Sequence, residues 1–164
     1  MNVWNDHSRD HQPFLSARKV ATNALRRPVA SIQNSDYSAV SLSVLLYSLG
    51  GCEIREDILY RGLFPQKRWN GHGNVHEVTL YDAGLNEQVA HLFSNRIKLD
   101  QAIKSCIQLD LIVLDTLVND SLAYSLSDQS RHQISQSFKH EELSRLGLMF
   151  VAHIYPRDQT LEPS

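Results

Sequence analysis

The chain has 164 residues, 42% of them hydrophobic and 21% charged, which excludes a disordered tail and fits a single globular domain. A chain of this length buries enough surface to fold without a disulfide or a metal. Sixteen Lys and Arg against 18 Asp and Glu give a formal charge of −2, without the basic excess that phosphate binding normally needs. We therefore expect no nucleic-acid partner.

The cysteines and the N-terminus bear on the cellular compartment. Cys52 and Cys106 form no C-x-x-C unit, so we expect two small buried thiols in a reducing compartment rather than a disulfide framework or a zinc site. Residues 1–14 are polar where a signal peptide would be apolar, and no later run approaches about 18 apolar residues. These features predict a cytoplasmic protein that does not associate with membranes.

Charge and periodicity divide the chain into two parts. Residues 1–30 carry five basic and two acidic residues, a net of +3, which leaves −5 for the rest of the chain. Apolar periodicity is weak before Leu25, and Pro28 follows, so we interpret residues 1–30 as a solvated basic arm or short helix. A domain at residues 31–164 is expected to follow it.

Helical spacing of apolar residues marks most of this domain. Helices are expected at residues 35–49, 54–61, 85–93, 99–109, 127–138 and 141–155. Gly62 is expected to end the second of them in a left-handed conformation. The last helix is apolar on most sides, and we expect it to be largely buried or partnered.

The remaining segments predict loops and short strands. Residues 63–73 contain one proline and two glycines and predict an ordered loop, followed by a short strand at about 78–81. Residues 111–114 and 122–126, with turn residues between them, predict a β-hairpin. Three helices, a hairpin and a helix predict a mostly α fold with a small β-hairpin, that is, a winged-helix-like helical domain.

Several short motifs occur in a characteristic order. They are Ile54-Arg-Glu-Asp-Ile-Leu-Tyr-Arg-Gly62, Pro65-Gln-Lys-Arg-Trp-Asn70, Ser94-Asn-Arg-Ile-Lys-Leu-Asp-Gln-Ala102, Tyr124-Ser-Leu-Ser-Asp128, Ile154-Tyr-Pro-Arg157 and Glu162-Pro163. Across residues 28–163 the chain resembles the winged-helix region of fungal NLR-like proteins. In that family the region lies between a nucleotide-binding ATPase core, of NB-ARC or NACHT type, and a repeat array. The resemblance implies a regulatory role between two neighbouring domains.

The two domains that flank this region in that family are both missing from this sequence. It contains no G-x-x-x-x-G-K-[ST] phosphate loop, and no repeat array follows the last expected helix. The chain is therefore expected to be either an excised module or a free-standing relative with another role.

The sequence offers few candidate residues for DNA binding, metal binding or nucleophilic catalysis. The helix expected at residues 99–109, which would be the DNA-reading third helix of a winged-helix domain, carries Lys104 against Asp100, with Asp110 beyond it, and this balance disfavours DNA reading. His72 and His76 have a spacing that suits metal binding on a helix, but the flanking glycines disfavour a helix there and the H-E-x-x-H order is absent. We interpret them as surface or loop histidines and expect no metal and no cofactor. No G-x-S-x-G nucleophile motif is present.

Polar and aromatic side chains concentrate in residues 61–76, and Tyr60 directly precedes them. The candidate ligand-binding residues are Tyr60, Arg61, Arg68, Trp69, His72 and His76. In a structural interpretation, Trp69 anchors the loop on the core and Arg68 satisfies helix-terminal carbonyls. In a functional interpretation, the same residues form one wall of a pocket.

Two hypotheses about function follow. In the first, the chain is a non-catalytic interaction module that binds a protein partner, or a second copy, through the last helix and residues 61–76. In the alternative, it is a stand-alone, cofactor-independent enzyme of fungal secondary metabolism. Such an isomerase or cyclase would hold a hydrophobic natural-product intermediate in an apolar pocket for a step such as a Diels–Alder reaction. The sequence leaves open whether the chain is an enzyme.

Overall fold

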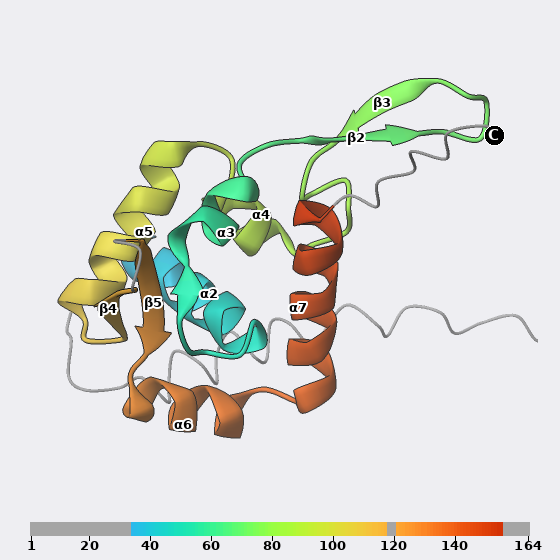
Figure 1. The fold of residues 1–164 in the computed structure, drawn as a ribbon. Coiled ribbons are helices and arrows are strands. Elements are labelled where there is room, and N and C mark those ends of the chain that lie inside the picture. Colours follow the sequence, from blue (N-terminus) through green and yellow to red (C-terminus); the bar gives the residue numbers. More distant parts are fainter. Residues whose placement is uncertain (1–33, 118–120, 156–164) are drawn as a thin grey trace, which may run out of the picture.

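A computed structural model describes residues 34–117 and 121–155, so the predicted arm at residues 1–30 lies outside the described residues (Figure 1). The fold is mostly helical with two small antiparallel sheets. In chain order the elements are α2 (Asn34–Ser48), β1 (Ile54–Arg55), α3 (Glu56–Arg61), β2 (Gln66–Trp69), β3 (Val75–Val78), α4 (Glu87–Leu92), α5 (Arg96–Gln108), β4 (Ile112–Thr116), β5 (Leu122–Leu126), α6 (Asp128–Ser137) and α7 (His140–Ile154). No helix in the described ranges is long and apolar enough to cross a membrane.

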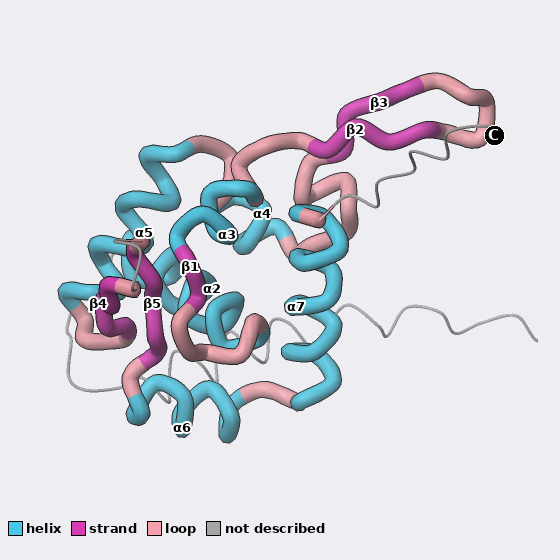
Figure 2. The backbone as a smooth tube through the Cα atoms, viewed as in Figure 1, coloured by secondary structure: helices cyan, strands magenta, loops and turns pink. Residues whose placement is uncertain are grey.

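Helix α2 forms the centre of the core, with α4, α5 and α7 packed around it (Figure 2). Apolar residues of α2 itself lie on most of its sides, as expected for a helix that is buried on several sides. Its residues Ala39, Leu42, Leu45 and Leu46 are fully buried. The surrounding elements are therefore fixed relative to one another through their contacts with α2.

A three-stranded sheet lies against this core in the order β1-β5-β4. The predicted hairpin at 111–126 is confirmed by β4 and β5, whose register places Leu114 opposite Tyr124. Strand β1 pairs with the other edge of β5 through Ile54 and Arg55. The helix expected from residue 54 therefore begins two residues later, because Ile54 and Arg55 complete the sheet instead.

The prediction of a loop at residues 63–73 is wrong, because this segment contains β2, which pairs with β3. Strand β3 also begins three residues before the strand expected at 78–81. The turn explains the pairing. The Asn70 side chain accepts hydrogen bonds from the backbone N–H groups of His72 and Asn74, and Gly73 adopts the left-handed φ of +78°.

Gly62 does not have the predicted left-handed conformation, since its φ is −62°. Its role is close packing. A Cβ atom at this position would lie 2.8 Å from the ring of Phe93 and 2.9 Å from the ring of Phe150. Glycine therefore lets the end of α3 approach the two aromatic rings that join α4 to α7.

Helix α5 begins three residues before its predicted start. Asn95 supplies the reason, because its side chain accepts a hydrogen bond of 2.9 Å from the backbone N–H of Lys98 and so caps the helix. The earlier start adds Arg96 and Lys98, so α5 carries three basic residues against the single acidic Asp100. The expected neutral or acidic balance of this helix is corrected to a net of +2.

Candidate functional site

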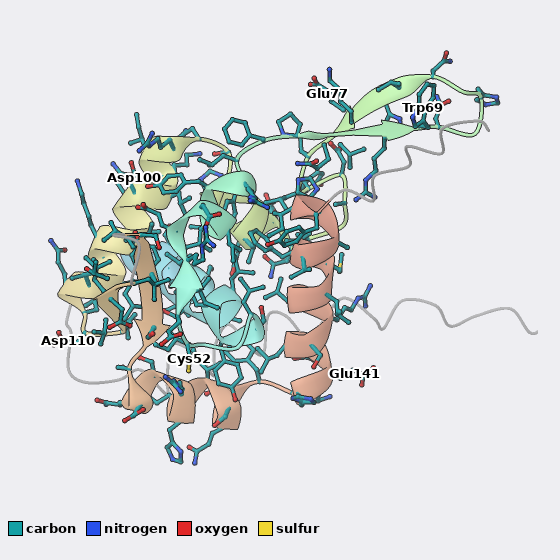
Figure 3. The ribbon with its side chains drawn as sticks, in the orientation of Figure 1. Cys52, Trp69, Glu77, Asp100, Asp110 and Glu141 are labelled. Carbon is teal, nitrogen blue, oxygen red and sulfur yellow. The ribbon has the colours of Figure 1, made fainter. Side chains whose placement is uncertain are left out.

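The β2–β3 hairpin projects from the helical body beside the C-terminal end of α7 (Figures 1 and 3). Side chains alternate between the two faces of a strand. The register places Trp69 opposite Val75 on one face, and Arg68 opposite His76 on the other, which also carries the buried Val78. Trp69 and Val75 are 67% and 50% exposed. The hairpin therefore presents a cross-strand apolar pair to solvent.

Helix α7 has one buried and one exposed side. Leu148, Val151 and Tyr155 are 70%, 39% and 50% exposed, and their spacing of three and four residues places them on one face. The expectation that this helix is buried or partnered therefore holds for one side only. We call Trp69, Val75, Leu148, Val151 and Tyr155 together the hairpin–helix surface.

Two arginines lie at the C-terminal end of α7. An Arg68 Nη2–H group donates a 3.5 Å hydrogen bond to the carbonyl oxygen of Ala152, in agreement with the structural interpretation of this arginine. The guanidinium of Arg61 lies 5.3 Å from the ring centroid of Tyr155 and also pairs with Asp57. Both positive charges interact favourably with the dipole of α7 at its C-terminus. They attach the hairpin and α3 to this end of the helix.

A buried histidine lies in the last turn of α7. His153 is 1% exposed, and its ring nitrogens have no hydrogen-bond partner among the described residues. Burial lowers the pKa of His153 below its ordinary value, and the charge of Arg68 lowers it further; the nearby backbone of Phe64, although outside hydrogen-bond geometry, partly opposes both. His153 is therefore neutral near pH 7 and packs as part of the core.

We expect His153 to make the fold sensitive to acid. A histidine with a lower pKa in the folded chain leaves stability intact above its ordinary pKa of 6.5 and reduces it as the pH falls toward the folded-state value. One group of this kind contributes at most about 1.4 kcal/mol per pH unit. Urea unfolding at about pH 7.5 and about pH 5.5 should therefore show a smaller loss of unfolding free energy for His153→Gln than for the wild type.

His132→Gln is the control for this measurement, because His132 is an exposed residue of α6 and its removal should leave the pH dependence unchanged. Equal pH dependence of His153→Gln and the wild type would show that burial of His153 does not couple folding to protonation.

Tyr60 belongs to a separate polar cluster between α3, α5 and β5. Its hydroxyl donates to Asp100 on α5, and the guanidinium of Arg96 lies 5.0 Å from the Tyr60 ring centroid. The Tyr124 hydroxyl on β5 donates a 3.1 Å hydrogen bond to Glu56 on α3. We call these five residues the tyrosine–carboxylate cluster; Asp100 is labelled in Figure 3.

The two tyrosines of this cluster act as hydrogen-bond donors. Burial, followed by the hydrogen bond to Asp100, raises the pKa of Tyr60 to about 12. Burial and the carboxylate of Glu56 raise the pKa of Tyr124 as well. Both hydroxyls therefore keep their protons at neutral pH, and the cluster joins α3 to α5 and β5.

The candidate residues predicted from the sequence are distributed over three places. Tyr60 lies in the tyrosine–carboxylate cluster, Arg61 at the C-terminal end of α7, Arg68, Trp69 and His76 on the hairpin, and His72 in its turn. The structure brings Arg61 and Arg68 to the same helix end but does not surround a pocket with the whole set. Trp69 is exposed, which corrects the expectation that it anchors this segment on the core.

The histidine and cysteine predictions are confirmed in part. His72 and His76 are exposed, as expected of surface histidines, and within residues 34–117 and 121–155 no group of three or more His, Cys, Asp or Glu could hold a metal ion. Cys106 is buried, and this burial raises the pKa of its thiol to about 12. Cys52 is exposed, contrary to expectation, because it follows the turn between α2 and β1.

Sequence patterns gave little indication of the individual residues on the exposed side of α7. Leu148 and Val151 belong to an almost continuous apolar run, so periodicity alone could not separate the buried residues from the exposed ones. His153 gave no signal either, since a single histidine in a helix is compatible with exposure or burial.

No protein-family model matches the chain, and comparison with curated proteins and with solved structures gives no significant match. Function is therefore inferred from the residues and their geometry.

Proposed function

We propose that this chain is a non-catalytic winged-helix interaction module that contacts a protein partner through the hairpin–helix surface. The observation that supports this most strongly is the exposure of five large apolar side chains on the hairpin and α7, each at least 39% exposed. Large apolar side chains that are exposed on two elements in contact with each other are candidates for an interaction site. An exposed tryptophan at such a site is typical of the residues that contribute most to binding.

The order of the elements supports the winged-helix part of the proposal. A winged-helix domain adds a β-hairpin, the wing, to a helix-turn-helix core. In this chain β4 and β5 follow α5 directly, and β1, between α2 and α3, pairs with the outer edge of β5. The β2–β3 hairpin and α4 are then insertions between the second and third helices of that core.

Charge favours a protein partner over a nucleic acid. Two of the three basic residues of α5 already have neighbouring partners: Arg96 pairs with Asp100 and stacks on Tyr60. Lys98 lies 3.4 Å from the ring of His91. Phosphate recognition normally uses several unpaired basic side chains on one face.

The small-molecule alternative receives less support. A hydrophobic substrate would need a largely enclosed apolar pocket with a few polar groups directed into it. Tyr60 instead donates its hydroxyl to Asp100, and Trp69 faces solvent on the hairpin. The geometry of these residues therefore favours the interaction module.

Site-specific photo-crosslinking in living cells tests the proposal. A photoreactive phenylalanine analogue would replace Leu148 in one version of the chain and Trp69 in another. Because both positions lie on the hairpin–helix surface, we expect them to crosslink to the same protein, identified by mass spectrometry. The attached partner should be lost when the other position of the surface is changed to arginine.

Position 104 supplies the control, because Lys104 is an exposed residue of α5, outside the hairpin–helix surface. Crosslinks of equal yield from all three positions would contradict a defined docking surface. A nucleic acid attached at position 104 would support the competing class of partner.

A further inference from the structure

We propose that the hairpin–helix surface binds a second copy of this chain, with the two α7 helices antiparallel about a two-fold axis near Leu148. The inference rests on the proposed function, because it names the partner of the same surface. Two-fold dimers are the commonest soluble oligomers, and each copy contributes the same patch to the interface. The patch must therefore be complementary to itself.

The apolar part of the surface meets this requirement. Leu148 is 70% exposed and lies one residue from the midpoint of α7 (His140–Ile154). In an antiparallel pair centred there, each Leu148 contacts its counterpart. One turn away, Val151 of one copy lies against the aliphatic part of Arg145 of the other. The most exposed leucine thus becomes the most buried residue of the interface.

The charges along α7 determine the orientation. The first turn carries Glu141 and Glu142, and Glu141 is labelled on the outer side of the helix in Figure 3. At the other end, Arg61 lies over Tyr155 and Arg68 donates to the last turn. An antiparallel pair brings Glu141 of one copy to Arg61 of the other, where it shares that guanidinium with Asp57, whereas a parallel pair brings the first-turn carboxylates of the two copies together. Complementary charges of this kind establish register and orientation.

The dimensions of the surface limit the affinity. A helix of 15 residues is about 22 Å long, so the pair buries less than the roughly 800 Å² per partner of a standard interface. Beyond the C-terminal end of α7, the projecting hairpin carries Trp69 (Figure 3), on the strand face opposite to that of Arg68. We therefore expect a reversible dimer with a micromolar Kd that weakens as salt screens the terminal charges.

Sedimentation equilibrium of the full chain between about 1 and 100 µM tests for this dimer. We expect a monomer–dimer equilibrium, and at least about a tenfold increase in Kd for Leu148→Arg, which places two positive charges at the axis. Ile97→Arg is the matched control, because Ile97 is a 68% exposed residue of α5. Thermal unfolding confirms that both variants fold.

Disulfide trapping tests the orientation. Cys52 is exposed, so the experiment uses a Cys52→Ser background. A mixture of the Glu141→Cys chain and the Tyr155→Cys chain should form a disulfide-linked heterodimer under mild oxidation, because antiparallel helices bring these positions together. Each chain alone should stay largely unlinked.

Three results would overturn the inference. They are a monomer throughout the concentration range, a dimer whose Kd is unchanged by Leu148→Arg, and disulfide homodimers of the single variants. A monomeric chain that still crosslinks to a different protein through position 148 would remove the dimer and leave the proposed function intact. Absence of both a dimer and specific crosslinks would remove both.

Discussion

Replacing Phe150 with alanine is expected to lower the free energy of unfolding by about 3–5 kcal/mol, the usual cost of deleting a buried aromatic ring. Phe150 is fully buried, and its ring lies 5.3 Å from that of Phe93, centroid to centroid. The same ring would contact any Cβ atom at Gly62. Its removal therefore leaves a cavity where α3, α4 and α7 meet. Urea unfolding followed by far-ultraviolet circular dichroism measures the loss.

Leu148→Ala in the same helix is the control for this prediction, since Leu148 is largely exposed. Measured on chain dilute enough to be monomeric, its free energy of unfolding should change by no more than about 0.5 kcal/mol. A loss below about 1 kcal/mol for Phe150→Ala would mean that α7 does not depend on this ring for its position in the core.

Gly147→Ala is expected to destabilise the fold by about 1–3 kcal/mol through overpacking. A Cβ atom at this position would lie 2.3 Å from the carbonyl oxygen of Ser48, at the end of α2, so α7 must move away from the central helix. The cost should exceed the roughly 1 kcal/mol that alanine gains over glycine from helix propensity. Thermal and urea unfolding both measure the difference.

Gly71→Ala is the same chemical change at a site with nothing within 4 Å of the added atom. Its stability should stay within about 0.5 kcal/mol of the wild type. If Gly147→Ala proves more stable than the wild type, then helix propensity outweighs the contact with Ser48, and α7 packs less closely on α2 than the structure shows.

The helices were predictable because the apolar residues in each of them recur with the period of an α-helix. Apolar spacing located all six helices in the described part of the chain, except for a few residues at their ends. The errors at the ends have local causes. Asn95 caps α5 before its first apolar residue, and Ile54 and Arg55 pair with β5 rather than join α3. The hairpin of β4 and β5 was also predictable, since both strands contain apolar, β-branched or alternating residues.

The β2–β3 hairpin could not be predicted in the same way. Its strands are polar and mostly exposed, so they lack the apolar alternation that marks a strand packed on a core. Proline and glycine in this segment indicated a loop. Pairing instead depends on the turn formed by Asn70 and Gly73 and on the contact of Arg68 with the end of α7.

The residues of the candidate site were also predictable only in part. The sequence identified the basic and aromatic residues of segment 60–76, and it identified Arg68 as a partner of helix-terminal carbonyls. It could not show that Tyr60 turns inward to Asp100 while Trp69 turns outward, because those two residues differ in tertiary surroundings rather than in type.

The sequence by itself determined the helical class of this protein, the positions of most helices and the β4–β5 hairpin after α5, since these follow from local periodicity and turn chemistry. Only the tertiary structure decided which side of α7 faces the core, why Gly62 and Gly147 must lack side chains, and where His153 is buried. These features depend on close contacts between segments far apart in the chain, and no local pattern records such contacts. The hairpin–helix surface consists of apolar side chains that those contacts leave exposed to solvent.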